Sequence, residues 1–142
     1  MRSVEPYLIF NGNCKEAFAF YESVFEVNAA FTSRYIDLPQ DVRANIAEED
    51  MDRIVHIISP VSDKVSLMGA DAPSNTPTVV GENVSLTLNT GSSAEAKRIF
   101  EQLSAGGDVK MPLQKTFWAE LYAMFTDKFG IHWMINYIPE ND

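Results

Sequence analysis

The sequence predicts an α+β fold in which two βαβββ modules form curved mixed sheets around a concave pocket. The first observation is a duplication, because a shift of 79 positions places Gly12 on Gly91 and Glu16 on Glu95. The second is a helix-start signal in each copy, and the third is a strand at 83–90 whose apolar and polar side chains alternate. A repeat of this length is too long for a solenoid, so each copy is expected to form one helix and four strands.

The first module begins with an apolar strand at residues 4–11, which ends in a turn. Asn13 and Glu16 have the spacing of a capping box, which predicts that a helix starts there. A second strand is predicted at 28–37. The buried face of the helix is expected to comprise Ala17, Phe20, Tyr21, Val24 and Phe25.

A polar, acidic connection follows at 38–52, and such a length often belongs to a flap or a partner contact. We interpret its run Glu48-Glu49-Asp50 as solvated. Strands at 53–59 and 64–70 complete the module, and 71–82 is a loop rich in Pro, Ser and Thr. We therefore expect a single domain over 1–142, with module one at 1–72, a linker at 73–82 and module two at 83–142.

The second module repeats this order, with a strand at 83–90 and a second capping box made by Ser92 and Glu95. Gly106-Gly107 ends its helix. Further strands are predicted at 108–113, 116–126 and 131–138. The buried face of the helix is expected to comprise Ala96, Ile99, Phe100 and Leu103. The strand residues expected to face the helices are Phe125, Trp133, Ile135 and Tyr137.

Composition restricts the class of protein. The chain has 142 residues, and its 46% hydrophobic and 22% charged residues are typical of one globular domain. The formal net charge of −9 would repel a phosphate backbone or an anionic membrane, so neither nucleic acid nor membrane is an expected partner. No apolar run approaches the roughly 20 residues of a membrane span, and we see no apolar signal core. We predict a soluble, cytoplasmic protein.

Polar side chains on the strand at 83–90 predict a cavity, because a dry core would leave them unmatched. They are Asn83, Ser85, Thr87 and Asn89. In the penultimate strand, alternation places four residues on one face: Trp118, Glu120, Tyr122 and Met124. His132 shares a face with Met134 in the last strand, which makes it a candidate proton donor or acceptor. The alternative is that aromatic side chains fill a collapsed bowl.

Three segments carry a resemblance to a known superfamily: PYLIFNGNCKEAFAFY, the strand of His56 followed by LMGADAP, and MFTDKFGIHWMINY. Paired βαβββ modules with these segments resemble the vicinal-oxygen-chelate superfamily. Its members include glyoxalase I, extradiol dioxygenases, and fosfomycin- and bleomycin-resistance proteins. The segments look most like its PhnB-like branch, over nearly the whole chain. The resemblance implies the glyoxalase/bleomycin-resistance-like fold.

The resemblance also implies where a metal would be held in the bowl, by His, Glu or Gln from four strands. Those places fall on Pro6, Ile58, Ser85 (or Asn83) and Met134. A proline ring, an alkyl chain or a thioether cannot replace a carboxylate or imidazole on a divalent ion. We therefore expect the fold without the family's metal site and without a cofactor.

Three functions remain open. The first is a metal-free protein that binds a small molecule on the concave sheet. The second is a lyase, isomerase or dioxygenase acting on a small oxygenated substrate, with His132 and Glu120 as acid and base or with a metal relocated to these two and His56. The third is a dimeric structural module with a filled bowl. The expected ligand-binding residues are Asn83, Ser85, Thr87, Trp118, Tyr122, Met124, Met134 and His56.

Two further motifs argue against other chemistry. Cys14 lies in the first turn of a helix, where the dipole favours a thiolate, but no His lies nearby in sequence to act as a base. We interpret it as a structural cysteine. No Gly-rich phosphate loop opens a helix, which argues against a methyltransferase with a Rossmann-type adenosyl-binding turn.

One helix for four strands leaves sheet edges and part of a face uncovered in each module. The first strand is apolar on both faces, as expected of a strand covered on both sides. We therefore predict a homodimer, the commonest closed assembly. The sequence leaves open whether the modules pair within one chain or are exchanged between chains.

Overall fold

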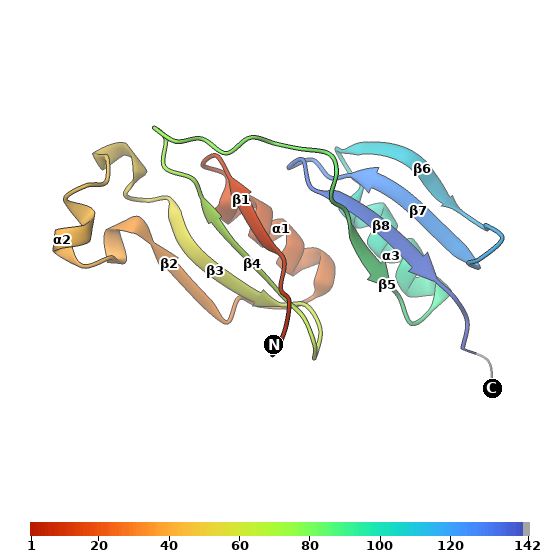
Figure 1. The fold of residues 1–142 in the computed structure, drawn as a ribbon. Coiled ribbons are helices and arrows are strands. Elements are labelled where there is room, and N and C mark those ends of the chain that lie inside the picture. The colour runs from red at the N-terminus through yellow and green to blue at the C-terminus, as the bar shows by residue number, and fades with distance from the viewer. Residues whose placement is uncertain (141–142) are drawn as a thin grey trace. The chain divides into compact units, whose positions relative to one another are not determined.

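The computed structural model describes residues 1–140 and divides into two compact units, Met1–Val79 and the part of the chain from Val80 on. Each unit is a four-stranded mixed sheet with a helix against one face (Figure 1). The α+β class and the two copies of strand, helix and three strands are therefore confirmed. The boundary between the units falls inside the segment predicted as a linker, 73–82.

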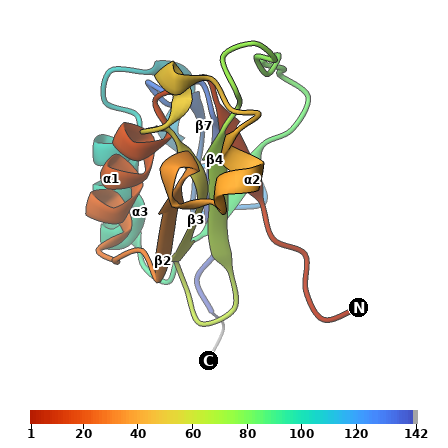
Figure 2. The same cartoon turned by 90° about the vertical axis from the view of Figure 1, so that its left-hand side faces the viewer.

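The N-terminal unit has the strand order β1-β4-β3-β2. β1 and β4 are parallel, and the other neighbours are antiparallel. The helix α1 covers one face of this sheet (Figure 2), and we call the opposite face the open face. The elements are β1 (Tyr7–Phe10), α1 (Cys14–Phe25), β2 (Phe31–Arg34), β3 (Ile54–Pro60) and β4 (Ser66–Asp71).

The segment after β2 is more ordered than the sequence indicates. The strand predicted at 28–37 ends at Arg34, and a helical turn, η1 (Tyr35–Asp37), follows it. The connection predicted as a loop contains two more turns, α2 (Gln40–Arg43) and η2 (Glu48–Asp50). The interpretation of residues 48–50 as a solvated run is wrong at its last residue, because Asp50 is only 1% exposed.

The start of α1 is capped by a residue far away in the sequence. Asn13 makes no side-chain capping bond, so the predicted capping box is wrong. Instead, the Asp71 carboxylate accepts hydrogen bonds of 2.9 Å from the backbone N–H groups of Gly12 and Cys14. The end of β4 thus satisfies the first amide of the helix, that of Cys14, and one amide of the preceding turn, a role that N-cap side chains usually take.

The buried face of α1 is rotated slightly from the predicted one. Phe20 and Phe25 are half-buried, whereas Phe18, which the prediction left out, is fully buried. Phe18 lies directly over Gly69 of β4, where an added Cβ would come within 2.6 Å of its ring. A glycine is therefore required for this close approach of helix to sheet. The buried residues of the helix are Cys14, Ala17, Phe18, Tyr21 and Val24.

The C-terminal unit has the strand order β5-β8-β7-β6, with β5 and β8 parallel. Its helix starts as predicted: Ser92 Oγ accepts from the Glu95 N–H at 3.1 Å, while the Glu95 carboxylate accepts from the Gly91 N–H at 3.0 Å. The elements are β5 (Leu86–Asn89), α3 (Ser93–Leu103), β6 (Asp108–Gln114), β7 (Leu121–Thr126) and β8 (His132–Tyr137).

The core of this unit lies between α3 and the β7–β8 pair. The predicted residues Phe125, Trp133 and Ile135 are almost completely buried, whereas Tyr137 is half-buried. On the helix, Ala96, Ile99 and Leu103 are buried, and Phe100 is half-buried against the edge of the Phe125 ring. Within residues 1–140, no helix has the length and apolar character that crossing a bilayer requires.

The strand predicted at 116–126 begins only at Leu121. A turn precedes it, in which the Thr116 N–H bonds to the Ala119 carbonyl and the Ala119 N–H bonds to Thr116 Oγ1, both at 3.1 Å. Trp118 and Glu120 therefore lie outside the strand, and their predicted alternation with Tyr122 does not apply.

Candidate functional site

The open face of the C-terminal sheet, opposite α3, carries polar side chains and methionines. Strand pairing arranges its side chains in rows. Thr87, Met134, Met124 and Met111 follow one another across β5, β8, β7 and β6. On one side of this row lie Thr126 and His132, and on the other lie Asn89, Asn136 and Tyr122.

The polar side chains of β5 are matched by β8. The Thr87 hydroxyl lies 3.8 Å from the Met134 sulfur, and Asn136 Nδ2 donates to Asn89 Oδ1 at 3.2 Å. The prediction of a cavity from unmatched polar groups therefore fails for Thr87 and Asn89, which are bonded across the strands. It stays open for Asn83 and Ser85, so the shape of the surface around them has to be considered as well.

A hollow of about 410 Å³ lies on this face, at the His132 end of the sheet. This volume is within the range of about 300–1,000 Å³ that small-molecule sites occupy. It brings together five of the predicted site residues: Asn83, Ser85, Met124, His132 and Met134. Sequence reasoning missed Glu82 and Lys110, and it assigned Phe125 to the core alone. No sequence signal marked Lys110, because its place follows from the pairing of β6 with β7 and from the register shift between Val109 and Met111.

His132 is held at both ring nitrogens. Its Nδ1 lies 2.8 Å from Thr126 Oγ1, and its Nε2 lies 2.9 Å from the Gly81 carbonyl oxygen. A carbonyl only accepts, so Nε2 carries a proton, and in the neutral ring Nδ1 accepts from the Thr126 hydroxyl. His132 thereby ties the segment 81–85, which supplies three lining residues, to the sheet. This geometry is that of a positioning residue.

Glu120 does not form a pair with His132. Its backbone N–H bonds to the Tyr137 carbonyl at 2.9 Å, whereas His132 pairs with Thr126 at the other end of β8. The five steps along β8 from His132 to Tyr137 correspond to about 17 Å at roughly 3.4 Å per residue. The Glu120 side chain is exposed. The two predicted catalytic residues are therefore too far apart to act on the same atom.

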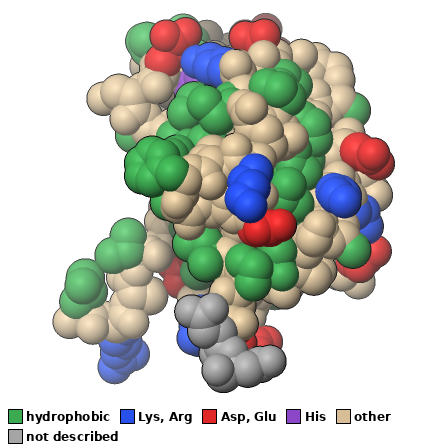
Figure 3. Space-filling view, turned by 90° about the vertical axis from the view of Figure 1, so that its right-hand side faces the viewer, with side chains coloured by type: hydrophobic (Ala, Val, Ile, Leu, Met, Phe, Trp, Pro, Cys, Tyr) green, Lys and Arg blue, Asp and Glu red, His purple; other side chains and the backbone are tan. Residues whose placement is uncertain are grey.

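Trp118 and Tyr122 lie at the end of the sheet away from the hollow. Their ring centroids are 5.1 Å apart, and the Phe117 ring centroid lies 4.7 Å from that of Trp118; both pairs meet edge to face. Phe117 is 97% exposed. Figure 3 shows that hydrophobic side chains gather in several areas of the surface, with acidic and basic side chains between them. These aromatic residues provide contact surface beside the open face.

His56 belongs to the N-terminal unit. Its Nδ1 lies 3.0 Å from the Tyr7 hydroxyl, the two rings are stacked with centroids 5.6 Å apart, and Phe31 lies 6.0 Å away. Burial, and to a smaller extent the charge of Cys14, raises the pKa of Tyr7. His56 thus lies in an aromatic cluster on the open face of its own sheet.

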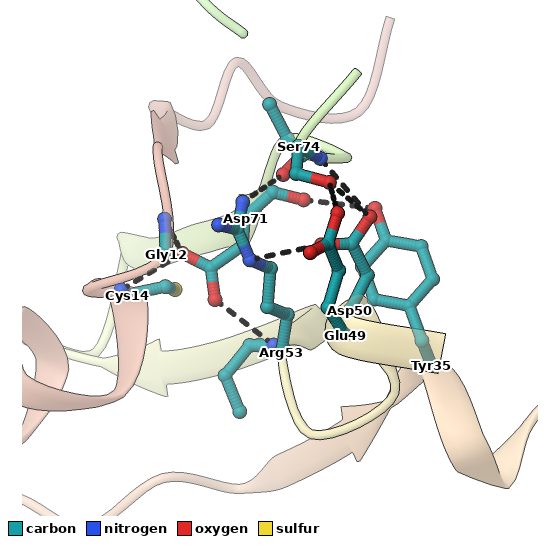
Figure 4. Close-up of polar contacts among 10 residues, drawn as sticks. Gly12, Cys14, Tyr35, Glu49, Asp50, Arg53, Asp71 and Ser74 are labelled. Carbon is teal, nitrogen blue, oxygen red and sulfur yellow. Dashed lines mark hydrogen bonds and ion pairs between the residues drawn. The ribbon is translucent and has the colours of Figure 1, made fainter. Parts of the chain in front are cut away.

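The largest buried polar cluster lies in the N-terminal unit and fastens loops together (Figure 4). Asp50 accepts from both the N–H and the hydroxyl of Ser74 at 3.0 Å and pairs with Arg53 at 3.3 Å. Arg53 also donates to the Ala72 carbonyl at 2.8 Å. The Asp71 carboxylate accepts from the Ile54 N–H, and its carbonyl accepts from the Tyr35 hydroxyl. Asp50 Oδ1 makes the ion pair with Arg53 but no hydrogen bond, and the other bonds join separate segments of the unit, which favours a structural role for the cluster.

Cys14 is fully buried next to this cluster. Burial, followed by the negative charge of Asp71, raises the pKa of its thiol from 9.0 to about 12. A thiol of this pKa is a weak nucleophile at neutral pH. The geometry therefore favours the structural interpretation of Cys14. Burial and the carboxylates of Asp50 and Asp71 likewise raise the pKa of Tyr35.

Asp127, in the turn between β7 and β8, has a structural role that the sequence reasoning missed. Its Oδ1 accepts from the N–H groups of Phe129 and Ile131 at 2.8 and 3.1 Å. Its Oδ2 accepts from the indole N–H of Trp133 at 2.8 Å. One buried carboxylate thus closes the FTDKFG turn and fixes the largest core side chain.

The described residues do not supply the donors of the superfamily's metal site. Within residues 1–140, no three His, Cys, Asp or Glu side chains are grouped so that they could hold a metal. Of the four places that the resemblance implies, Ser85 and Met134 line the hollow, and Pro6 and Ile58 belong to the N-terminal unit. These side chains do not fit a divalent ion.

Known proteins share both the sequence and the fold. A sequence model of the family described as 3-demethylubiquinone-9 3-methyltransferase matches residues 2–136. Protein YjdN of Escherichia coli (strain K12) is 30% identical over 143 residues, which cover 96% of each chain. Protein PA1353 from Pseudomonas aeruginosa has a TM-score of 0.86 at 38% identity, covering 97% of this chain and 100% of that one.

Two further solved structures show the fold. A putative 3-demethylubiquinone-9 3-methyltransferase, PhnB protein, from Bacillus cereus has a TM-score of 0.73 at 20% identity, covering 95% of this chain and 98% of that one. A glyoxylase/bleomycin resistance protein/dioxygenase domain from Frankia sp. EAN1pec has a TM-score of 0.69 at 11% identity, covering 100% and 96%. The chain therefore belongs to the 3-demethylubiquinone-9 3-methyltransferase family, and its fold is that of the glyoxalase/bleomycin-resistance proteins, as the resemblance implied.

Proposed function

We propose that this protein binds a small oxygenated organic molecule in the hollow on the open face of the C-terminal sheet, without a divalent metal. The observation that carries the proposal is the composition of the hollow. Met124 and Met134 provide an apolar, adaptable floor. Asn83, Ser85 and Lys110 line it as well, and within residues 1–140 their side chains make no hydrogen bond or ion pair.

The rim residues favour a particular class of ligand. The Lys110 ammonium is the cation among the lining residues, and it suits a carboxylate or another oxyanion. Ser85 and Asn83 can donate to and accept from a hydroxyl or carbonyl oxygen. Glu82 accepts from a hydroxyl and offsets the Lys110 charge, which disfavours ligands of high negative charge. A short hydroxy or keto acid with a small carbon skeleton combines these features.

Methyl resonances of methionine provide the test. Protein labelled with ¹³C in the methionine methyl groups is titrated with glycolate, lactate and 2-oxobutyrate and followed by NMR. We expect at least one of these acids to shift the Met124 and Met134 resonances in a saturable way. Met68, which lies on the N-terminal sheet, serves as the internal control.

A variant of the rim gives the second half of the test. Lys110→Gln removes the cation and keeps a polar side chain of similar length, so affinity for the responding acid is expected to fall about tenfold or more, or about 1.4 kcal/mol. Lys64→Gln, in the turn before β4, is the matched control and should leave affinity unchanged. The proposal is wrong if none of the acids moves the Met124 methyl, or if Lys110→Gln binds as tightly as the unchanged protein.

The second candidate function is an enzyme that uses a relocated metal. Elemental analysis of the purified protein shows whether such a metal is bound. The protein as purified is expected to contain well under one Zn, Ni, Mn or Fe per chain. Within residues 1–140 no three His, Cys, Asp or Glu side chains are grouped to hold a metal, and the one imidazole of the hollow, His132, has both ring nitrogens bonded. About one such ion per chain, lost in His56→Ala or His132→Ala, would establish the enzyme hypothesis instead.

The family description names a methyl transfer, which the fold does not support. Rossmann-type methyltransferases bind the adenosyl group at the end of a doubly wound parallel sheet. Both sheets described here have one parallel pair of strands and are otherwise antiparallel. A cytoplasmic location and a homodimer stay predictions.

A further inference from the structure

The three methionines on the open face of the C-terminal sheet lie in a single row. The chain has six methionines, and the register pairs Met111 with Met124 and Met124 with Met134 across β6, β7 and β8. Half of the methionines thus occupy neighbouring positions on one sheet face. A core that only needed apolar volume would have no reason to favour methionine at all three positions over leucine or isoleucine.

The three methionines are partly accessible and occupy directly opposed positions on neighbouring strands. All three residues are half-buried, and Met124 and Met134 line the hollow. The Met134 sulfur lies 3.8 Å from the Thr87 hydroxyl, so it faces across the open surface of the sheet. Directly opposed residues of an antiparallel pair have Cβ atoms about 4.5–5.5 Å apart. Two metal–sulfur bonds of about 2.3 Å span a similar distance, and methionine has the torsional freedom to adjust.

The neighbouring donors restrict which ion this row could hold. Both ring nitrogens of His132 are already bonded, to Thr126 and to Gly81. Glu82 is the one carboxylate among the residues that line the hollow, and the Lys110 charge offsets it. Thioethers without imidazole or carboxylate select soft ions, Cu(I) above all, over Zn(II) or Mn(II).

We propose that Met111, Met124 and Met134 form a thioether site for one soft monovalent cation, of the class of Cu(I). The net charge of −9 favours the approach of a cation to this protein. The site shares Met124 and Met134 with the floor of the proposed organic site, but it does not need the rim residues. An ion there would turn the floor of the hollow into a Lewis-acidic surface.

Silver provides a redox-inert probe of the site. The Cys14→Ala protein, which has no thiol, is titrated with Ag(I) and examined by native mass spectrometry and by ¹³C NMR of the methionine methyl groups. One Ag(I) per chain is expected, with the largest shifts at Met124 and Met134 and none at Met68. Cu(I) held by bicinchoninate under ascorbate should be transferred in the same one-to-one ratio, and excess Zn(II) should not compete.

Leucine variants identify the ligands while keeping the volume of the side chain. Met124→Leu and Met134→Leu should each weaken Ag(I) binding at least tenfold, whereas Met68→Leu should leave it unchanged. Ag(I) binding that persists in Met124→Leu/Met134→Leu, or the absence of any one-to-one complex in the Cys14→Ala protein, would overturn the site. The NMR shifts are measured in the Cys14→Ala protein, which keeps all its methionines. The test of the site therefore does not depend on a leucine variant that folds poorly. Neither result bears on the hydroxy-acid titration, which Lys110→Gln tests separately.

Discussion

Two buried carboxylates each accept several hydrogen bonds and so fix the turns and helix ends around them. Asp71 receives the first amide of α1 and one amide of the preceding turn, and Asp127 receives two turn amides and the Trp133 indole. Each carboxylate accepts hydrogen bonds from N–H groups that would otherwise need separate acceptors. A charged acceptor forms stronger hydrogen bonds than a neutral one, and removing it leaves several donors unmatched at once.

The turn at Asp127 is therefore expected to be a point of high sensitivity. Asp127→Ala leaves three N–H donors without their acceptor, one of them inside the core, and should lower the free energy of unfolding by about 2–4 kcal/mol. Urea unfolding followed by circular dichroism measures the change. Asp63→Ala, on an exposed turn, is the matched control and should stay within about 0.5 kcal/mol. Equal, small changes in both variants would contradict this role.

Cys14 is expected to be chemically inert in the folded protein. Burial and the Asp71 charge raise the pKa of its thiol to about 12, so the thiolate is scarce at pH 8. The reaction with an aromatic disulfide reagent at pH 8 should be at least about a hundredfold slower in native protein than in urea, where the thiol has its ordinary pKa of about 8.5. As the pH rises through 9 and towards 12, the reaction should accelerate. Complete reaction of native protein within seconds at pH 8 would contradict the prediction that Cys14 is inert.

At the scale of the element, α1 shows how a helix can be predicted while its orientation is not. The spacing of apolar residues predicted a face with Phe20, whereas the buried face has Phe18. The choice between them depends on Gly69, which lies 51 positions after Phe18 and provides the space for its ring. Helical periodicity contains no information about that distant glycine.

The two phenylalanines offer a direct comparison. Phe18→Ala should cost about 3–5 kcal/mol, because the residue is fully buried and its loss opens a cavity over Gly69. Phe20→Ala should cost markedly less, since Phe20 is half-buried. Chemical denaturation of both variants measures the difference. A larger loss for Phe20→Ala would mean that the helix faces the sheet as the sequence alone predicted.

The alternation of buried and exposed side chains was predicted correctly within regular strands. The prediction failed where a turn interrupts the strand. Residues 132–135 and 123–125 alternate as predicted, because α3 covers one side of β7 and β8. The segment 116–120 has a similar aromatic and apolar composition, but the Thr116–Ala119 turn removes it from the sheet. The sequence also could not reveal Lys110 as a lining residue, because that depends on which strand pairs with β7.

At the scale of the whole molecule, the exposed apolar residues support a homodimer. Tyr7, Ile9 and Phe31 on the open face of the N-terminal sheet are 44%, 48% and 51% exposed. In the C-terminal unit, Phe117 and Trp118 are exposed at the tip of a hairpin. Large exposed aromatic side chains grouped in this way are typical of interaction surfaces.

Sedimentation equilibrium at micromolar concentration should therefore show a species of twice the 15.9 kDa chain mass. An interface of at least about 1,000 Å² in total is required for such a complex to be stable. Phe31→Ser and Phe117→Ser, which remove aromatic contact surface, should shift the equilibrium towards the monomer. Val79→Ser, at an exposed aliphatic residue between the two sheets in sequence, is the control. A single 15.9 kDa species over the whole dilution range would exclude the dimer.

The bond between Asp127 and the Trp133 indole has a practical consequence for spectroscopy. The chain contains two tryptophans, and their surroundings differ: Trp133 is 1% exposed and bonded to a carboxylate, whereas Trp118 is 46% exposed. Emission from Trp133 should lie at shorter wavelength and resist quenching by iodide, while that of Trp118 should be quenched readily. A Trp118→Phe protein would then carry one fluorophore in the core of the C-terminal unit. Its emission would report the unfolding of that unit, and native Trp118 would report contacts made at the hairpin tip.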